Sequence, residues 1–302
     1  MNRKRSARLT VVLTTDGSRQ AHAAVAFAGA VPWAGTTTAH MVLARGGIPL
    51  GPWAADIWVA GMSDAPERAL EREISRTRRI VRHRWPDMTV SALNTPPIGA
   101  IIAEARRRRA GVIVVGSRGL GFAHRLMLGS VSRGVIRRAG CPVLVVKGRR
   151  RRMKRLVLAT DGSPNASRAL GFLLARFEPP AGARVKVVRV LEPVLPRTRV
   201  LLPAPVHRAI VLSAANLNTK RTRQARREVS EAAVLLKRAG WSARGVVREG
   251  VPLAEVLREA AASRADLLVV GARGTGGLAR LLLGSVAEGA LDRSPVPVLL
   301  VK

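Results

Sequence analysis

The segment VLTTDGS at residues 12–18 recurs as VLATDGS at residues 157–163, an offset of 145 positions. Farther along, VVGSRG at residues 114–119 recurs as VVGARG at 269–274, at an offset of 155. A repeat on this scale indicates two copies of one structural unit, each containing several secondary-structure elements. The 302-residue chain is therefore predicted to fold as two tandem domains, each with its own hydrophobic core.

The repeat also sets the expected domain boundaries. The two halves end alike, with PVLVVK at residues 142–147 and PVLLVK at residues 297–302. We assign residues 1–147 to the first domain, the arginine-rich residues 148–154 to a linker and residues 155–302 to the second domain. The larger second offset means ten extra residues in the second half, which we place in a loop at 192–205 because this stretch is rich in proline.

Within each half, short β-branched runs alternate with segments of helical length. In the first half we expect strands near residues 9–14, 37–43, 88–93, 112–115 and 143–146, and helices near residues 20–29, 64–84, 98–109 and 130–139. Such alternation predicts an α/β fold in which right-handed crossovers join the strands of a parallel sheet with helices on both faces. We expect two Rossmann-like domains, each a five-stranded sheet of order 3-2-1-4-5.

A glycine pattern, Gly-x2-Gly-x9-Gly-Ser, follows the fourth strand of each half. Its members are Gly116, Gly119, Gly129 and Ser130 in the first half, and Gly271, Gly274, Gly284 and Ser285 in the second. Glycine at the end of a strand allows the backbone to turn and to approach a ligand closely. The last Gly-Ser pair opens a helix, whose unpaired N–H groups and positive dipole end favour phosphate. The pattern therefore predicts an anion-binding loop.

An aspartate ends the first strand of each half, Asp16 and Asp161. In a sheet of order 3-2-1-4-5, strands one and four are neighbours, and ligands bind in the crevice at their carboxyl ends. Each aspartate is therefore expected to face the glycine loop of its own half. A carboxylate there suits the hydroxyl groups of a ribose, which donate hydrogen bonds, better than it suits phosphates.

Together these motifs resemble the universal stress protein family, in particular its tandem members and its ATP-binding branch, over nearly the whole of both halves. The resemblance implies an adenine nucleotide alpha hydrolase-like fold and a stress-response protein that binds ATP, alone or with Mg²⁺. The positions that it implies are Thr15, Asp16, Gly116, Gly119, Gly129, Ser130 and Val131 in the first half, and Thr160, Asp161, Gly271, Gly274, Gly284, Ser285 and Val286 in the second. It also implies that the end of the second strand, Met41 or Val42 and Val190, meets the adenine.

The first half departs further from the family pattern than the second. The family usually has an aspartate before the fourth strand, and the second half keeps Asp266 where the first has Gly111. The second half also has Gly-Val-Pro at residues 250–252, where the first has Thr-Pro-Pro at 95–97. If a single site is occupied, we expect it to be the one in the second half.

The chain is strongly basic, with 52 Lys and Arg against 19 Asp and Glu and a net charge of +33. Nonspecific binding of nucleic acid or another polyanion is therefore an alternative function, and its affinity would fall with salt. Sequence-specific or single-strand recognition is not supported, because aromatic residues make up 3% of the chain and do not alternate with the arginines. We interpret the arginine runs as solvated helix ends and a basic linker in preference to a nucleic-acid-binding surface.

A dedicated ATP-consuming enzyme is not expected. The chain has no Walker loop, and its five histidines do not recur at matching positions, so we interpret them as surface or packing residues. Slow hydrolysis of bound ATP is a further alternative, and Asp16 and Asp161 are the only repeated carboxylates that we place near the loops.

Composition also restricts the location and the partners of the chain. The longest apolar runs are too short to cross a bilayer, so we expect no membrane partner. A single cysteine, Cys141, fits a reducing cytoplasm and is interpreted as a small packing residue. The last strands of the two halves would leave apolar edges, and we expect them to pair within the chain as a pseudo-dimer. A homodimer of the whole chain is an additional alternative.

Overall fold

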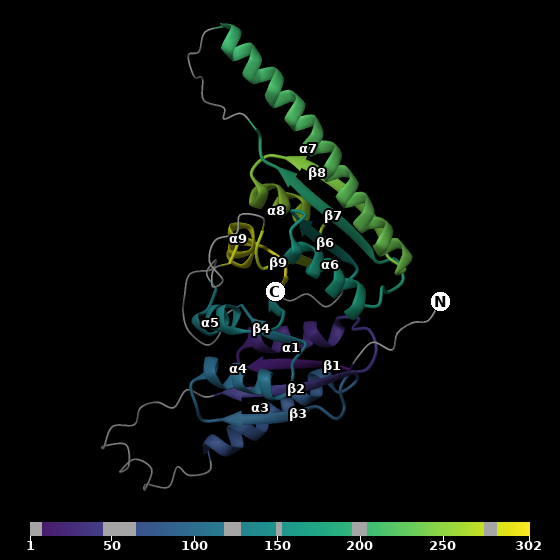
Figure 1. Ribbon diagram of the computed structural model, residues 1–302. Coiled ribbons are helices and arrows are strands. Elements are labelled where there is room, and N and C mark those ends of the chain that lie inside the picture. The colour runs from purple at the N-terminus through teal and green to yellow at the C-terminus, as the bar shows by residue number, and fades with distance from the viewer. Residues whose placement is uncertain (1–7, 45–64, 118–127, 149–152, 195–203, 275–282) are drawn as a thin grey trace, which may run out of the picture.

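The computed structural model of the protein describes residues 8–44, 65–117, 128–148, 153–194, 204–274 and 283–302 (Figure 1). Strands and helices alternate along both halves. In chain order the first half contains β1 (Leu9–Thr15), α1 (Arg19–Ala30), β2 (Thr37–Ala44), α3 (Ala65–Val81), β3 (Thr89–Leu93), α4 (Pro97–Arg107), β4 (Val112–Gly116), α5 (Ser130–Arg138) and β5 (Val143–Val146). The second half contains β6 (Arg155–Thr160), α6 (Pro164–Arg176), β7 (Arg184–Leu191), α7 (Ala204–Arg238), β8 (Ser242–Glu249), α8 (Pro252–Ala262), β9 (Leu267–Gly271), α9 (Ser285–Arg293) and β10 (Val298–Val301).

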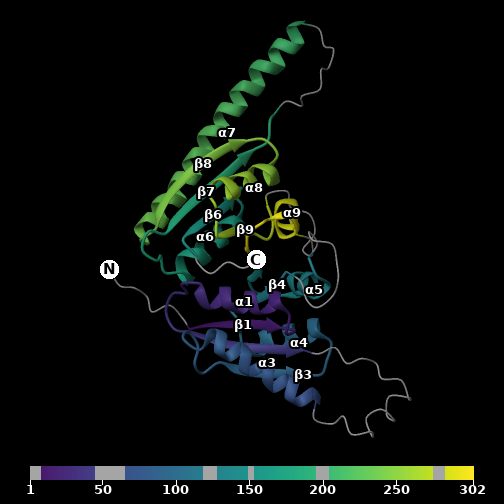
Figure 2. The same cartoon turned by 180° about the vertical axis from the view of Figure 1, so that it is seen from behind.

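All ten strands belong to one sheet of order β3-β2-β1-β4-β5-β10-β9-β6-β7-β8. Within each half the neighbouring strands are parallel and follow the order 3-2-1-4-5, which confirms the predicted fold class. The central strands are almost entirely buried, as expected for parallel strands covered by helices on both faces. Figures 1 and 2 show the helices of each half on the two faces of this sheet.

The two halves join through β5 and β10, which pair antiparallel. Leu144 lies opposite Leu299, Val143 opposite Leu300 and Val145 opposite Val298. Since Leu144 and Leu299 are equivalent in the repeat, a pseudo-twofold axis passes between them. The edge pairing that the sequence analysis expected is therefore present within the chain.

This pairing changes the expectation that each half has a separate core. One hydrophobic cluster contains residues of α1, α3, α6 and α7 on one face of the sheet, and another contains residues of α4, α5, α8 and α9 on the other face. Both clusters include residues from the two halves because the joined sheet continues across the seam. Leu144 and Leu299 belong to the first cluster, and Val145 and Val298 belong to the second.

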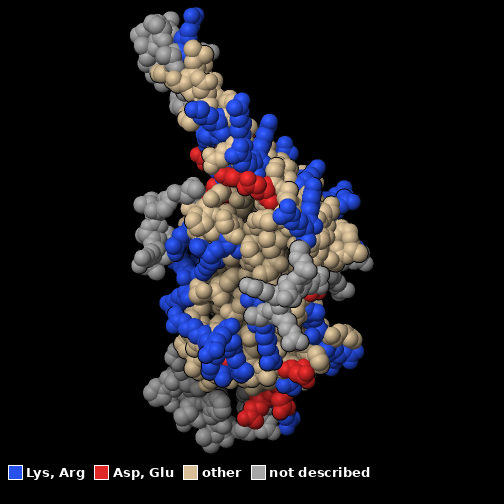
Figure 3. Space-filling view, turned by 45° about the vertical axis from the view of Figure 1, so that its right-hand side comes forward, with Lys and Arg blue, Asp and Glu red and all other residues tan. Residues whose placement is uncertain are grey.

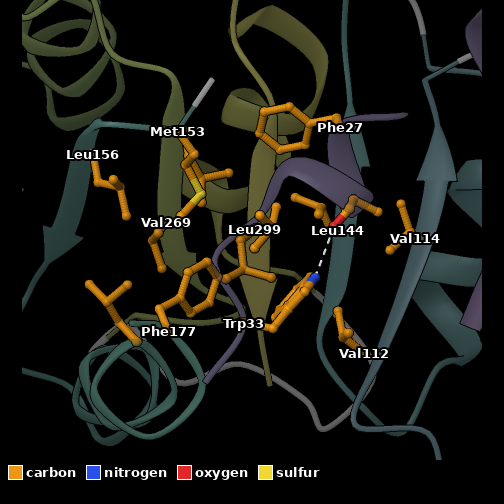
Figure 4. Close-up of a cluster of buried hydrophobic side chains, with 14 of the residues drawn as sticks. Phe27, Trp33, Val112, Val114, Leu144, Met153, Leu156, Phe177, Val269 and Leu299 are labelled. Atoms are coloured by element: carbon orange, nitrogen blue, oxygen red, sulfur yellow. Dashed lines mark hydrogen bonds between the residues drawn. The ribbon is translucent and has the colours of Figure 1, made fainter. Parts of the chain in front are cut away.

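Aromatic packing adds a second contact across the seam. Trp33 and Phe177 form an antiparallel bridge, and their ring centroids are 5.1 Å apart. The indole Nε1 of Trp33 donates a hydrogen bond to the carbonyl of Ala28 at 2.9 Å, so its polar atom is satisfied although the side chain is buried (Figure 4). In the same view Leu144 and Leu299 lie beside this pair.

Two equivalent lysines connect the last helices of the halves. Lys147 Nζ donates a hydrogen bond to the carbonyl of Asp292 at the end of α9, at 3.0 Å. Lys302 Nζ donates to the carbonyls of Ile136, at 2.6 Å, and Ala139 at the end of α5. The last carbonyls of a helix have no partner within the helix, and a cation there also favours the negative dipole end. Each half therefore caps a helix of the other.

The largest difference between the halves is the helix that follows the second strand. In the first half α3 has 17 residues, whereas α7 has 35 and extends away from the body (Figure 1). Part of the predicted loop at 192–205 is in fact helical, because Pro205 lies in the first turn of α7, where proline is tolerated. Residues 195–203 of that stretch lie outside the described residues.

We predict that Leu144→Ala at the pseudo-twofold axis lowers the free energy of unfolding by about 2–5 kcal/mol, because it leaves a cavity in the core that the halves share. Chemical denaturation measures this change. The matched control is Leu212→Ala, since Leu212 is 59% exposed and its truncation should change the free energy by less than about 0.5 kcal/mol. Equal effects of the two substitutions would contradict a seam that contributes to stability.

A second prediction concerns the only cysteine. Burial raises the pKa of the Cys141 thiol from its usual 9.0 to about 11, while the charge of Lys302 acts in the opposite direction. The thiolate is the reactive form, so alkylation by iodoacetamide at pH 8.5 should be about a hundredfold slower in the folded chain than in the unfolded chain. Mass spectrometry over time measures both rates, and equal rates would show that Cys141 is accessible and ionised in the folded state.

Candidate functional site

β1 and β4 are neighbours in the first half, as are β6 and β9 in the second, and we call the region at their carboxyl ends, where open α/β sheets bind ligands, the crevice. A short turn follows β1 and β6 at the same place. Gly17 and Gly162 adopt positive φ angles of 80° and 76°, a region in which a side chain would be strained. The repeated Asp-Gly-Ser sequence is therefore suited to this turn.

The aspartate and the serine of this turn also hold its backbone. Asp16 Oδ1 accepts a hydrogen bond from the N–H of Ser18 at 3.0 Å, and Asp161 Oδ1 accepts one from Ser163 at 3.0 Å. Each serine is the N-cap of the next helix, with its hydroxyl oxygen accepting from the N–H three residues on. The predicted ribose-binding carboxylates are thus fixed at the rim of the crevice.

In the second half the aspartate and the glycine loop lie face to face. A Cβ added to Gly274 would lie 2.5 Å from Asp161 Oδ2, so a side chain at this position would displace the carboxylate. The hydroxyl of Ser163 donates to the carbonyl of Arg273 at 3.3 Å, which links the turn to the start of the loop. These contacts place the two sequence motifs of this half on opposite walls of one crevice.

The first half has the same frame around its loop. Gly116 and Ser117 are buried at the end of β4, and the N–H of Gly129 donates to the carbonyl of Ser117 at 2.8 Å, matching the bond from Gly284 to Ala272 at 2.9 Å. Gly119 lies outside the described residues, so its predicted place opposite Asp16 stays a prediction.

The helices that follow the loops begin at glycine. Gly129 is the N-cap of α5 and Gly284 that of α9, and neither helix has a side-chain hydrogen bond at its cap. The first-turn residues Ser130, Val131, Ser285 and Val286 are the predicted phosphate positions, and Ser130 and Ser285 are exposed. Helix N-termini without a side-chain cap offer N–H donors to an anion.

The charge near these two N-termini differs between the halves. α9 has Glu288 in its first turn, whereas α5 has no acidic residue there and carries Arg133 at the equivalent position. Arg133 also pairs with Asp292 of the second half at 3.3 Å. A carboxylate disfavours a bound phosphate, so this charge difference opposes the expectation that the second half has the better site, which stays a prediction.

Gly271 has a packing role that the sequence did not indicate. A Cβ on Gly271 would lie 2.8 Å from the carbonyl carbon of Asn165 and 2.9 Å from its oxygen, in the first turn of α6. Backbone atoms cannot move aside as a flexible side chain can. Gly271 therefore permits the close approach of β9 and α6, in addition to any contact with a ligand.

The predicted adenine residues at the ends of β2 and β7 are mostly buried. Met41 and Val42 are fully buried on opposite faces of the sheet, and Val190 is half-buried. Val42 pairs with Thr14, whereas the equivalent Ala159 pairs with Val188 and not with Val190. The residue equivalent to Val42 is therefore Val188, two positions before Val190. Contact with adenine stays a prediction for both Val42 and Val190.

Two further carboxylates lie next to the Asp-Gly turns. Glu73 of α3 accepts hydrogen bonds from Thr15 Oγ1 at 2.9 Å and Thr77 Oγ1 at 3.0 Å, and its Oε1 is 2.8 Å from His22 Nε2. In the second half Glu228 pairs with Arg189 at 3.0 Å. Asp16 and Asp161 are thus not the only repeated carboxylates near the loops. Glu73 and Glu228 are 155 positions apart, the offset of the glycine loops, and that spacing was the signal that could have identified them.

A second repeated pair of carboxylates lies under the opposite face of the sheet. Glu104 contacts His40 at 3.2 Å, and Glu259 contacts Lys186 at 2.6 Å. Burial, together with the charge of Arg108, lowers the pKa of His40. Burial alone would raise the pKa of Glu259, but hydrogen bonds from Lys186 and Arg248 outweigh it and lower the pKa. Each pair joins a strand to a helix. His40 therefore makes a packing contact, which is one of the two roles expected of the histidines.

Asp266, the residue that the second half keeps and the first half lacks, is not in the crevice. Its Oδ2 accepts hydrogen bonds from the N–H groups of Lys154 at 3.0 Å and Arg155 at 2.9 Å, at the amino end of β6. In the first half the space next to Gly111 is filled by Leu9, whose Cδ1 would lie 2.2 Å from an added Cβ. The departure at Gly111 therefore concerns strand packing and not the site.

No three His, Cys, Asp or Glu side chains come together as a metal site within the described ranges. None of the helices among the described residues is long and apolar enough to span a bilayer.

Comparison with known proteins follows the same division of the chain. Residues 8–147 and 153–302 each match the model of the universal stress protein family. A universal stress protein of Thermus aquaticus is 33% identical over 49% of this chain and 98% of its own length. One from Mycobacterium bovis is 28% identical over 64% of this chain, which spans 62% of that relative. The crystal structure of a universal stress protein from Archaeoglobus fulgidus is 20% identical, with a TM-score of 0.62 over 97% of this chain and 98% of that one.

We predict that Gly271→Ala lowers the free energy of unfolding by about 1–3 kcal/mol, because its methyl group overpacks the contact between β9 and α6. Thermal or chemical denaturation measures the loss. The matched control is Gly171→Ala within α6, where an added Cβ meets nothing within 4 Å and helix propensity should raise stability slightly. A loss of stability in the control, or none in Gly271→Ala, would contradict this assignment.

Proposed function

Because the chain belongs to the universal stress protein family, we propose that it binds an adenine nucleotide, ATP among them, in the crevice of each half. The observation that carries the proposal is the opposition of Asp161 and Gly274 across the crevice of the second half. One wall offers a carboxylate for hydroxyl donors, and the other leads through a glycine loop to a helix N-terminus. Ribose and phosphate need these two kinds of partner.

The donors and acceptors present fit such a ligand. Asp161 Oδ1 accepts from Ser163, and the hydroxyl groups of a ribose are donors that suit a carboxylate. The N–H groups at the start of α9 and the hydroxyl of Ser285 would hold phosphate oxygens. Mg²⁺, if present, would be held through the phosphates, since the described residues contain no cluster of metal ligands.

We regard the chain as a binding module and not as a dedicated enzyme, and a role in a cytoplasmic stress response is part of the same proposal. Slow hydrolysis of bound ATP is a subordinate alternative. General binding of polyanions is the main competing function, because Lys and Arg are spread over the surface (Figure 3). The two functions differ in whether they need a carboxylate.

We predict that Asp161→Ala weakens ATP binding in the second half by about 1.5–3 kcal/mol, the usual loss when hydrogen bonds to a charged group are removed. Binding of inorganic polyphosphate or DNA should hardly change, since neither places a ribose against Asp161. Isothermal titration of each ligand at two salt concentrations measures both effects.

Asp87→Ala is the matched control, because Asp87 is exposed in the turn before β3, at the opposite edge of the sheet. It should leave ATP binding unchanged. Polyanion binding should fall steeply with salt in all variants, whereas nucleotide held in a crevice is less screened. If ATP and DNA weaken together with salt and Asp161→Ala changes neither, the protein is a basic anion binder instead.

A further inference from the structure

The N-terminal part of α7 projects from the body of the protein and meets it at its base, where Arg221 donates a hydrogen bond to the carbonyl of Glu192 at 3.1 Å. Where the helix packs on the sheet, it buries Ala225, Val229, Ala233 and Leu236. N-terminal to Ala225, none of the described side chains of α7 is buried. Figures 1 and 2 show this part of the helix extending away from both halves from opposite directions of view. We call residues 208–224 the arm, a segment about 25 Å long at the usual helical rise.

An unsupported helix of this length is marginal in water, since helices in proteins are stabilised chiefly by packing of an apolar face. The arm has such a face. Ile210 and Leu217, 40% and 48% exposed, lie seven residues apart on one side with Ala214 between them. Val211 and Leu212 are 39% and 59% exposed, so four of the seven large exposed apolar side chains of the described chain lie within eight residues. This face requires a partner.

The charge of the arm restricts what the partner can be. The arm contains no acidic residue, and its basic residues are Arg208, Lys220, Arg221 and Arg223. A second copy would bring the same positive charge against the arm, which disfavours pairing of two arms. The partner must therefore be apolar where it meets Ile210 and Leu217 and anionic where it meets the basic residues.

We propose that the arm binds the surface of an anionic lipid bilayer. Helices that lie in the bilayer interface combine an apolar face with flanking Lys and Arg, and their affinity comes from buried apolar area and from attraction to anionic headgroups. Figure 3 shows mostly uncharged residues along the outer arm, with basic side chains gathered where it joins the body. The expectation of no membrane partner rested on apolar runs too short to cross a bilayer, and binding to a bilayer surface does not need a spanning segment.

Vesicle co-sedimentation of the full-length chain tests the proposal. We expect binding to phosphatidylcholine vesicles that contain phosphatidylglycerol, weaker binding at high salt, and little binding to pure phosphatidylcholine. Ile210→Asp/Leu217→Asp should reduce the binding by about tenfold or more, since it places charge on the apolar face. The matched control is Val234→Asp/Leu235→Asp, at residues that are 45% and 44% exposed on the same helix but over the body, and it should bind as wild type.

Three results would overturn the proposal. The first is equal binding of wild type and Ile210→Asp/Leu217→Asp to anionic vesicles, which would leave only a diffuse basic attraction. Equal loss in the arm variant and the control would be the second, because it would mean a general effect of added acid. The third is a lipid-free dimer, seen by light scattering, that dissociates in the arm variant, which would assign the apolar face to a second copy. None of these measurements involves nucleotide, so they are independent of the proposed function.

Discussion

The antiparallel pairing of β5 with β10 is the constraint on which the rest of the structure depends. Each half alone would end in a short, fully apolar strand with an unpaired edge, a feature that promotes association with other chains. Pairing the two edges produces one sheet of ten strands and leaves only β3 and β8 at its ends. It also makes the two cores continuous across the seam, and it brings α5 and α9 near enough for Lys147 and Lys302 to cap them reciprocally.

The same arrangement connects the two candidate sites. The helices α5 and α9 follow the glycine loops, and Arg133 in the first turn of α5 pairs with Asp292 in the last turn of α9. The halves are nevertheless unequal around the crevice. Glu73 is held by a histidine and two threonine hydroxyls, while its counterpart Glu228 is held by an arginine. Duplication has thus kept the backbone frame of both sites, and the charges around them have diverged.

α7 is the element in which the halves differ most. α7 has 35 residues, whereas the described part of α3 has 17, and the buried stripe from Ala225 to Leu236 corresponds to the part that α3 also has. The projecting part of α7 adds a surface with exposed apolar and basic side chains and leaves the sheet order intact. This separation would allow one fold to carry both the proposed nucleotide site and the proposed attachment to a lipid surface.

Sequence alone determined the features that rest on local and periodic patterns. The repeats at offsets of 145 and 155, the alternation of strands and helices, and apolar edge strands are visible in one dimension, so the sheet order and the pairing of the halves could be predicted. The opposition of aspartate and glycine loop in the second half could also be predicted, because neighbouring strands bring their carboxyl ends together. Only the tertiary structure decided the role of Gly271 against Asn165, the position of Asp266 at the far edge, and the bonds of Glu73 and Glu228. Each of these depends on atoms from elements far apart in the chain, and no spacing in the sequence specifies the distance between them.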